Sequence, residues 1–339
     1  MIVPLALSIA LVAAPIDVGG RKQLFVDKRF IAESDRIELR ANPPQKLGLV
    51  RDETGKPVEG HVSRVLDIDG KARLYLGHEN VEVLESGDGL EFRRTGVRIS
   101  QGLFPTIFLD PHERDPARKY KLFHLEFSEP FDPAKHGVFA SHSADGVKFT
   151  KVGRVFPFFT DNPTIVHWDD DARRYVIYTR AFDYTSENQR RIGRIETDDP
   201  LKPWPYTPTK KDRLFPSIDN IRVVYSADRD DDPHSDVYYN AVTRSEDVYL
   251  MFPAHFRHFS PRRNPFIRPR KKGEWEDYGM LETQLAVSRD GINWSRPSRG
   301  EAYIPNGTAD EWDRWYTIAG PGVVRRGNFV YQYYTSTGR

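Results

Sequence analysis

One short motif occurs three times in the chain and constrains its fold more than any other feature. The pattern is Ser-x-Asp-Gly-x-x-aromatic, and it covers residues 86–92, 143–149 and 288–294. Asp-Gly between two β-rich runs predicts a hairpin turn, because glycine supplies the positive φ that tight turns need. The serine and aspartate side chains can bond backbone groups within such a turn. Each copy therefore predicts the junction of two antiparallel strands, the second of which begins with an aromatic residue.

A second series of β-rich runs accompanies these turns. Each run follows a polar turn that is itself preceded by another apolar run, and the five runs contain Tyr75, Tyr120, Tyr175, Tyr249 and Tyr331. The unit is thus strand, turn, strand, linker, strand, Asp-Gly turn and aromatic strand. Four consecutive antiparallel strands of this kind predict one small sheet that recurs along the chain.

Repetition of a four-stranded sheet is typical of a β-propeller. The alternative all-β fold, a two-sheet sandwich, also has many short strands but gives no reason for an internal repeat. The sequence therefore predicts an all-β fold, a five-bladed β-propeller of four-stranded antiparallel blades that forms a single domain over residues 21–339. Only two strands are indicated for the fifth blade. We expect residues 22–33 to supply a closing strand, which leaves one strand missing, as in a C-terminally truncated fragment.

Composition and the N-terminus limit the classes of function. The 50 basic and 49 acidic residues give a net charge of +1, so neither nucleic acid nor a membrane surface is an expected partner. The chain has no cysteine, which excludes disulfides, thiolate metal sites and cysteine nucleophiles. Residues 2–14 are almost wholly apolar and small residues follow them. We interpret residues 1–20 as a signal peptide and expect a secreted or periplasmic protein, the alternatives being a mis-assigned start or an apolar tail.

Four stretches resemble known proteins. They read LFVDKRFIAESDRIELRANPP (24–44), YVIYTR (175–180), DVYLMFPAHFRHF (247–259) and LAVSRDGINW (285–294). Together with the blade plan they resemble the five-bladed propellers of glycoside hydrolase families 32 and 43, and most closely exported planctomycete-type members described as glycosidase-like. The resemblance implies cleavage of glycosidic bonds by three acids in the central cavity: a base or nucleophile, an aspartate that orients it and tunes its pKa, and a glutamate that donates a proton. The hallmark tripeptides of the superfamily are absent in standard form, so residues are assigned by blade position.

Three acids fit these positions. Hydrolysis needs carboxyl groups on both sides of the scissile bond, and in a propeller the starts of the innermost strands converge on the axis. Asp161 precedes the first strand of the third blade and is the predicted base. Asp219 is predicted to enter the fourth blade and to tune the base, and Glu282, which opens a strand, is the predicted proton donor. The structural alternatives are Asx turns for the aspartates and a solvated strand face for the glutamate.

Further side chains are predicted to bind the carbohydrate. They are polar or aromatic residues on or beside β-rich runs: His61, Trp168, Arg180, Arg222, Tyr239 and Arg257. The structural alternatives are salt bridges between blades for the arginines and packing between blades for the aromatic residues. No metal site or other cofactor is predicted. The acidic runs at 169–171 and 228–236 contain oxygen ligands that suit Ca²⁺, but they are interpreted as solvated turns.

The sequence thus predicts an exported glycoside hydrolase that acts on a polysaccharide or oligosaccharide by carboxylate acid/base catalysis. The alternative is a non-catalytic carbohydrate-binding or scaffold propeller, which the absent tripeptides favour. A sialidase ranks third, because its Asp box has one more residue between aspartate and glycine than the motif in this chain.

Overall fold

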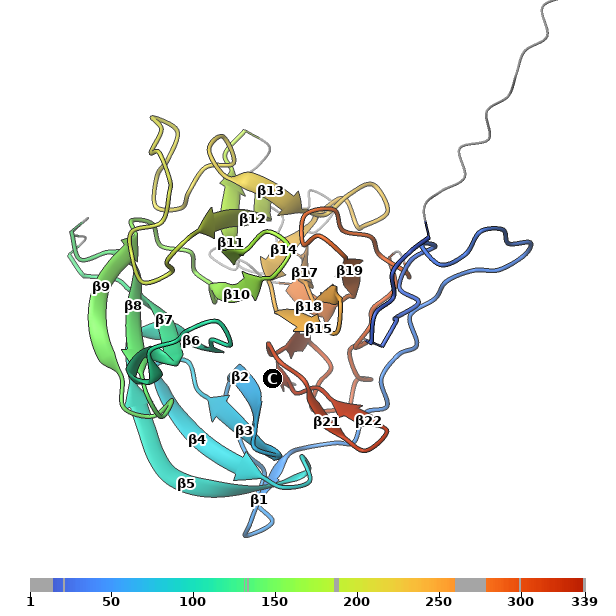
Figure 1. Cartoon of the computed structure of the whole chain (residues 1–339), viewed down its shortest axis with the longest axis horizontal. Coiled ribbons are helices and arrows are strands. Elements are labelled where there is room, and N and C mark those ends of the chain that lie inside the picture. The colour runs from blue at the N-terminus through green and yellow to red at the C-terminus, as the bar shows by residue number, and fades with distance from the viewer. Residues whose placement is uncertain are drawn as a thin grey trace, which may run out of the picture.

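The computed structural model describes residues 15–20, 22–130, 132, 134–185, 189–259, 279–298 and 300–337. Within these residues the regular structure is all β apart from one 3₁₀ turn, η1 (Pro116–Arg118). Figure 1 shows small sheets arranged around a centre, with the first strand of each blade innermost. The prediction of an all-β propeller is confirmed.

The first three blades are four-stranded antiparallel sheets whose strands follow sequence order, and a short strand, β1 (Arg51–Asp52), adds in parallel to the outer edge of the first blade. From the inside outward the first blade has β2 (Val62–Ile68), β3 (Lys71–Leu76), β4 (Asn80–Ser86) and β5 (Glu91–Ser100); the second has β6 (Leu103–Leu109), β7 (Tyr120–Glu126), β8 (Gly137–Ser143) and β9 (Thr150–Phe156); the third has β10 (Ile165–Asp169), β11 (Arg174–Asp183), β12 (Gln189–Thr197) and β13 (Arg222–Tyr225).

The fourth and fifth blades are less regular, because each of their strands is bent into two pieces. The fourth comprises β14 (Ser235–Tyr239), β15 (Val242–Ser245), β16 (Val248–Met251), β17 (Ala254–His258), β18 (Gly279–Thr283) and β19 (Ala286–Ser288); the fifth comprises β20 (Tyr316–Ala319), β21 (Val324–Arg326), β22 (Phe329–Tyr331) and β23 (Tyr334–Thr337). At one end of the two blades the pieces join into a single sheet, β14-β17-β18-β20-β23. In the described part of the chain the fifth blade has only two bent strands, as predicted.

The three Asp-Gly motifs form the same turn. In the second blade the Ser143 Oγ accepts a hydrogen bond from the backbone N of Gly146 at 3.0 Å, and Asp145 Oδ1 accepts one from the backbone N of Val147 at 2.8 Å. The equivalent bonds are present at 86–91 and 288–293. All three glycines have positive φ, as the turn requires.

These turns also join neighbouring blades. In each case a buried tyrosine on the preceding blade donates its hydroxyl hydrogen bond to the carbonyl of the turn glycine: Tyr333 to Gly89 (2.7 Å), Tyr75 to Gly146 (3.1 Å) and Tyr178 to Gly291 (2.9 Å). We call these bonds tyrosine latches. The repeated motif is therefore a joint between blades as well as a hairpin turn.

The ring is closed by contacts between the fifth and first blades. The backbone N of Val65 donates to Pro321 O at 3.0 Å, and the backbone N of Val62 donates to Thr335 Oγ1 at 2.9 Å. Gly322 has a φ of +99°, and a Cβ there would lie 2.1 Å from Val65 O, so only glycine allows this approach.

The expected closing strand over residues 22–33 is wrong. These residues form no strand where the structure describes them, and they instead follow the side of the fourth blade. Arg289 binds Asp27 at 2.7 Å and donates to Leu24 O at 3.0 Å. Residues 22–33 therefore form an external segment, which we call the strap. Arg289 holds it through the Asp27 carboxylate and the Leu24 carbonyl, and it adds no strand to a sheet edge.

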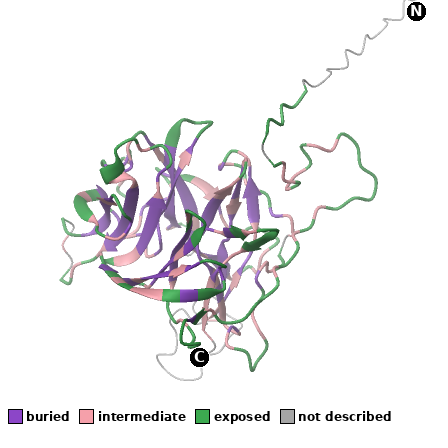
Figure 2. Cartoon of the chain, turned by 60° about the horizontal axis from the view of Figure 1, so that its bottom comes forward, coloured by how far each residue is buried: buried purple, intermediate pink, exposed green. Residues whose placement is uncertain are grey.

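Apolar side chains between neighbouring blades form the core, which appears as the purple strands of Figure 2. Residues 1–14, which contain the apolar part of the predicted signal peptide, lie outside the described residues. Among the residues that are described, no helix is long and apolar enough to cross a membrane.

Candidate functional site

Asp161 and Arg180 form the centre of the candidate site. Asp161 precedes β10, the inner strand of the third blade, and Arg180 lies on the adjacent strand β11. The Asp161 Oδ2 accepts a hydrogen bond from the Arg180 Nη1 at 2.6 Å. The arginine side chain is 1% exposed and the aspartate side chain 32% exposed. A buried cation therefore holds a carboxylate that still faces solvent.

The backbone of Asp161 adopts an unusual conformation. Its φ is +48°, in the left-handed region that residues other than glycine rarely occupy. The turn is held by Thr160, whose Oγ1 donates to Asn162 O at 3.0 Å, and Pro163 follows. Residues in such conformations are frequent at functional sites, where the surrounding structure maintains them.

The fourth blade completes the surroundings of Arg180. Tyr238 O accepts hydrogen bonds from the Arg180 Nη2 and, at 3.3 Å, from the Asn162 Nδ2. The Tyr238 ring centroid lies 5.2 Å from the Arg180 Cζ, a cation–π contact. The Asn162 Oδ1 is buried and has no partner in the described structure, so this acceptor remains available within the site.

The first blade contributes His61, which precedes β2. Its Nε2 lies 2.6 Å from the hydroxyl of Tyr239, a fully buried side chain at the end of β14. Burial, with a smaller contribution from the nearby His78, lowers the pKa of His61 to about 4. Burial also raises the pKa of Tyr239 well above its usual value. At neutral pH both groups are uncharged, and the tyrosine hydroxyl can donate to the imidazole.

His78 and Glu79 are site residues that the sequence did not reveal. They follow β3, and the hydrogen bond from the backbone N of Gly77 to His61 O places this turn beside His61. Burial lowers the pKa of His78, and the negative charges of Glu79 and Asp161 partly oppose that shift. The carboxylates of Glu79 and Asp161 therefore both interact electrostatically with the His78 imidazole. The signal available in the sequence was the polar pair directly after an apolar strand.

The other two predicted acids are not joined to Asp161. In the described chain no hydrogen bond or ion pair connects Asp161 with Asp219 or Glu282. Asp219 precedes β13, the outer strand of the third blade, and its carboxylate pairs with Lys211. The expectation that Asp219 enters the fourth blade is wrong, because that blade begins at β14. Glu282 lies on β18, where it pairs with His255 of the neighbouring strand β17, and its carboxylate lies 3.9 Å from the Arg257 side chain.

The predicted carbohydrate-binding residues separate into two groups. His61, Arg180 and Tyr239 belong to the cluster around Asp161. The other three lie elsewhere: Arg222 is exposed on the outer strand β13, Arg257 pairs with Asp232 at 3.3 Å on β17, and Trp168 stacks on His112 at the opposite end of β10 from Asp161.

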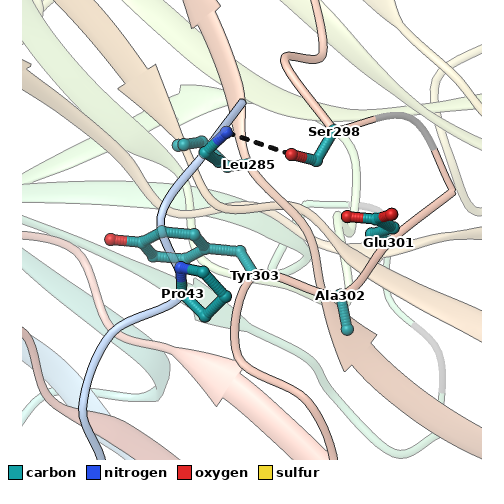
Figure 3. Close-up of a pocket in the computed structure, with 7 residues that line it drawn as sticks. Pro43, Leu285, Ser298, Glu301, Ala302 and Tyr303 are labelled. Atoms are coloured by element: carbon teal, nitrogen blue, oxygen red, sulfur yellow. Dashed lines mark hydrogen bonds between the residues drawn. The ribbon is translucent and has the colours of Figure 1, made fainter. Parts of the chain in front are cut away.

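A separate pocket lies between Ala41 and Pro43, which follow the strap along the chain, and Leu285 in the fourth blade. It spans about 260 Å³ including space open to solvent, and the backbone N of Ala41 donates to Ser298 Oγ at 3.0 Å across it. Figure 3 shows Pro43, Tyr303 and Glu301 among its lining side chains. Glu301 is the single carboxylate of this lining, so the pocket lacks the pair of acids that glycoside hydrolysis needs. No cluster of three or more potential metal ligands occurs among the residues that the structure describes.

Comparison with solved structures supports the architecture. A complex of BT0996 and RGII has a TM-score of 0.53 and 14% identity and covers 87% of this protein and 88% of its counterpart. A glycoside hydrolase has a TM-score of 0.52, 14% identity and the same coverage. A candidate glycosidase from Bacteroides thetaiotaomicron VPI-5482 has a TM-score of 0.50 and 11% identity and covers 87% of this protein and 90% of its counterpart. At these identities the likeness shows the fold alone. No protein-family model and no curated protein sequence matches the chain.

Proposed function

We propose that this protein is a glycoside hydrolase-like enzyme that cleaves a polysaccharide or oligosaccharide where the inner strands of its blades meet, with Asp161 as the catalytic carboxylate. One observation carries the proposal. Asp161 is partly exposed, is held in a left-handed conformation and is bound at 2.6 Å by the buried Arg180. A carboxylate that is held by a buried cation and still faces solvent is oriented as a base or nucleophile requires.

Arg180 and the neutral histidines have supporting roles in this proposal. Arg180 orients Asp161 through the hydrogen bond from its Nη1 to the Asp161 Oδ2. His61, uncharged at neutral pH, offers a hydrogen bond to a sugar hydroxyl, and the buried Tyr239 holds its ring.

We assign the proton donor to Glu79 in preference to Glu282. Glu79 acts with Asp161 on His78, whereas Glu282 contacts Arg257 on the fourth blade. Glu79 is exposed, so a bound sugar can reach its carboxyl group. Glu282 remains the alternative donor.

The test is product release from a panel of polysaccharides and oligosaccharides, measured by chromatography. Asp161→Asn and Glu79→Gln should each abolish most of the activity of the wild type, and Glu282→Gln should retain it. Asp219→Asn is the matched control, because Asp219 lies at the outer strand of the third blade. Full activity in Asp161→Asn would reject the proposed role of Asp161.

A second candidate is a carbohydrate-binding propeller without catalysis. The observation that favours it is the pairing of Asp161 with a cation, together with the lack of any described carboxylate in direct contact with it. Calorimetry with the same oligosaccharides distinguishes the two functions. Binding without product release would support the second and contradict the first.

The resemblance to exported planctomycete-type proteins leads to one further part of the proposal, which concerns location. We propose that the chain is exported with cleavage near residue 20. The intact mass of protein recovered from the periplasm or medium tests this, and a mass that includes the first residues would contradict it.

A further inference from the structure

Arg64 is a buried cation without a counter-charge. It lies on β2, the inner strand of the first blade, and is 8% exposed. No hydrogen bond or ion pair joins it to any residue in the described parts of the chain, and its buried Nε has no partner. Burial lowers the pKa of Arg64 to about 10, so the guanidinium remains protonated at neutral pH. An unpaired buried charge is costly and calls for a compensating group.

The position of Arg64 sets it apart from equivalent residues on other inner strands. Those residues bond to the next blade: Thr106 Oγ1 to Thr164 O (2.6 Å), His167 Nε2 to Val242 O (2.8 Å) and Gly322 N to Thr243 Oγ1 (2.8 Å). Arg64 makes no such bond within the described structure. Its charge lowers the pKa of His167, which lies two blades away on β10, so the guanidinium points toward the axis rather than outward.

A second unpartnered polar side chain lies at the same level of the ring. Asn240 is fully buried, and both its Oδ1 and Nδ2 lack a hydrogen-bond partner among the described residues. Its neighbour Tyr239 contacts His61 on the first blade, and Val242 contacts His167 on the third. Asn240 thus lies between one contact that crosses the ring to the first blade and one that joins the neighbouring third blade, and its amide offers donors in addition to those of Arg64.

The ligand that fits these groups is small and negatively charged. Guanidinium and amide N–H groups are hydrogen-bond donors, and a single negative charge balances Arg64. Arg64 lies three residues further along β2 than His61, roughly 10 Å deeper in the ring. The His61–Tyr239 contact separates it from the site of Asp161. An anion here is therefore not part of a sugar bound beside Asp161.

We propose that the centre of the propeller holds a halide-sized inorganic anion bound by Arg64, with the Asn240 amide as a second donor. The anion replaces the missing counter-charge and joins the first and fourth blades. The site is independent of the proposed glycosidase function, because no residue around Asp161 takes part in it.

The test compares thermal unfolding in bromide and gluconate at equal ionic strength, so that general screening cancels. For wild-type protein we expect the Tm to rise by about 2–4 °C as bromide replaces gluconate up to about 100 mM. Arg64→Met should lose this response. Arg222→Met, which removes an exposed arginine, is the matched control and should keep it.

A second measurement tests the proposal on the wild-type protein alone, and so does not depend on whether Arg64→Met folds. Anomalous diffraction from wild-type crystals grown in bromide should show a peak within about 4 Å of the Arg64 guanidinium. Formate, the smallest carboxylate, is titrated in parallel, so that binding of a halide can be distinguished from binding of a carboxylate. Stabilisation by formate alone, or an equal Tm in bromide and gluconate with no peak at Arg64, would overturn the proposal.

Discussion

The carboxylate of Asp161 lies 2.6 Å from the Nη1 of Arg180, whose side chain is 1% exposed. The two residues come from neighbouring strands of one blade, and Tyr238 of the next blade binds the same guanidinium. The buried guanidinium fixes the direction of the exposed carboxylate. This pair is the reason for assigning the site to Asp161.

Replacing Arg180 should affect function more than stability. Arg180→Met removes the buried cation and leaves the Asp161 carboxylate, which is partly exposed and can be solvated, so the cost should stay below the roughly 3–5 kcal/mol of a fully buried pair that loses one partner. The free energy of unfolding should fall by less than about 2 kcal/mol, as measured by urea denaturation. Carbohydrate turnover or binding should fall at least 10-fold.

A double-mutant cycle sharpens that prediction. If Arg180 acts through Asp161, the variant carrying both Arg180→Met and Asp161→Asn should be no worse than Asp161→Asn alone. Additive losses would show that Arg180 has a separate role. Arg222→Met serves as the control for removal of an arginine.

Tyr239 should matter for the site through its hydroxyl group. Tyr239→Phe keeps the buried ring and removes only the group that lies 2.6 Å from the His61 Nε2. We expect kcat/KM or binding affinity to fall about 5-fold, because one hydrogen bond is worth roughly 1 kcal/mol. An NMR titration of His61 in the same variant should show a changed pKa; an unchanged pKa would contradict the contact.

Acid should destabilise the protein through its buried histidines. Burial, with help from the charge of Arg64, lowers the pKa of His167 to about 3. Since the folded pKa lies below the unfolded value, this stability is present above about pH 6.5 and is lost as the pH falls. Each such group contributes about 1.4 kcal/mol per pH unit.

The measurement is urea denaturation between pH 7 and pH 5. His167→Gln keeps a donor for Val242 O and should unfold with a shallower dependence on pH than the wild type. His112→Gln, which alters a histidine outside the buried set, should keep the wild-type slope. Equal slopes in the wild type and His167→Gln would show that His167 does not titrate with folding.

The tyrosine latches should contribute to stability and not to the site. Tyr178→Phe removes the hydroxyl that donates to Gly291 O at 2.9 Å, and the free energy of unfolding should fall by about 1–2 kcal/mol. Tyr331→Phe removes a hydroxyl with no hydrogen bond in the described structure and should have little effect. If both variants are equally stable, the latches do not hold the blades together.

The repeat and the place of Asp161 could be predicted from the sequence, because both depend on local patterns. Asp-Gly specifies its own turn, and the Asp-Asn-Pro step directly precedes an inner strand. The tyrosine latches were not predictable, since each joins residues that are far apart in sequence.

Asp219 shows the limit of local patterns. Like Asp161 it is followed by asparagine and a β-rich run, yet that run is an outer strand. Whether a strand lies inside or outside its blade depends on how many strands precede it, and the long segment between β12 and β13 concealed that count. His78 and Glu79 were missed because a turn between two strands gives no sign that it faces the axis.

The most direct test of the role of Asp161 is the rate of product release from oligosaccharides by the wild type and by Asp161→Asn. Asparagine tolerates the left-handed conformation, so this change removes the charge without changing the turn. We predict at least a 100-fold loss of rate, with unchanged folding and with Asp219→Asn retaining activity. Equal rates for Asp161→Asn and the wild type would contradict the proposed catalytic role.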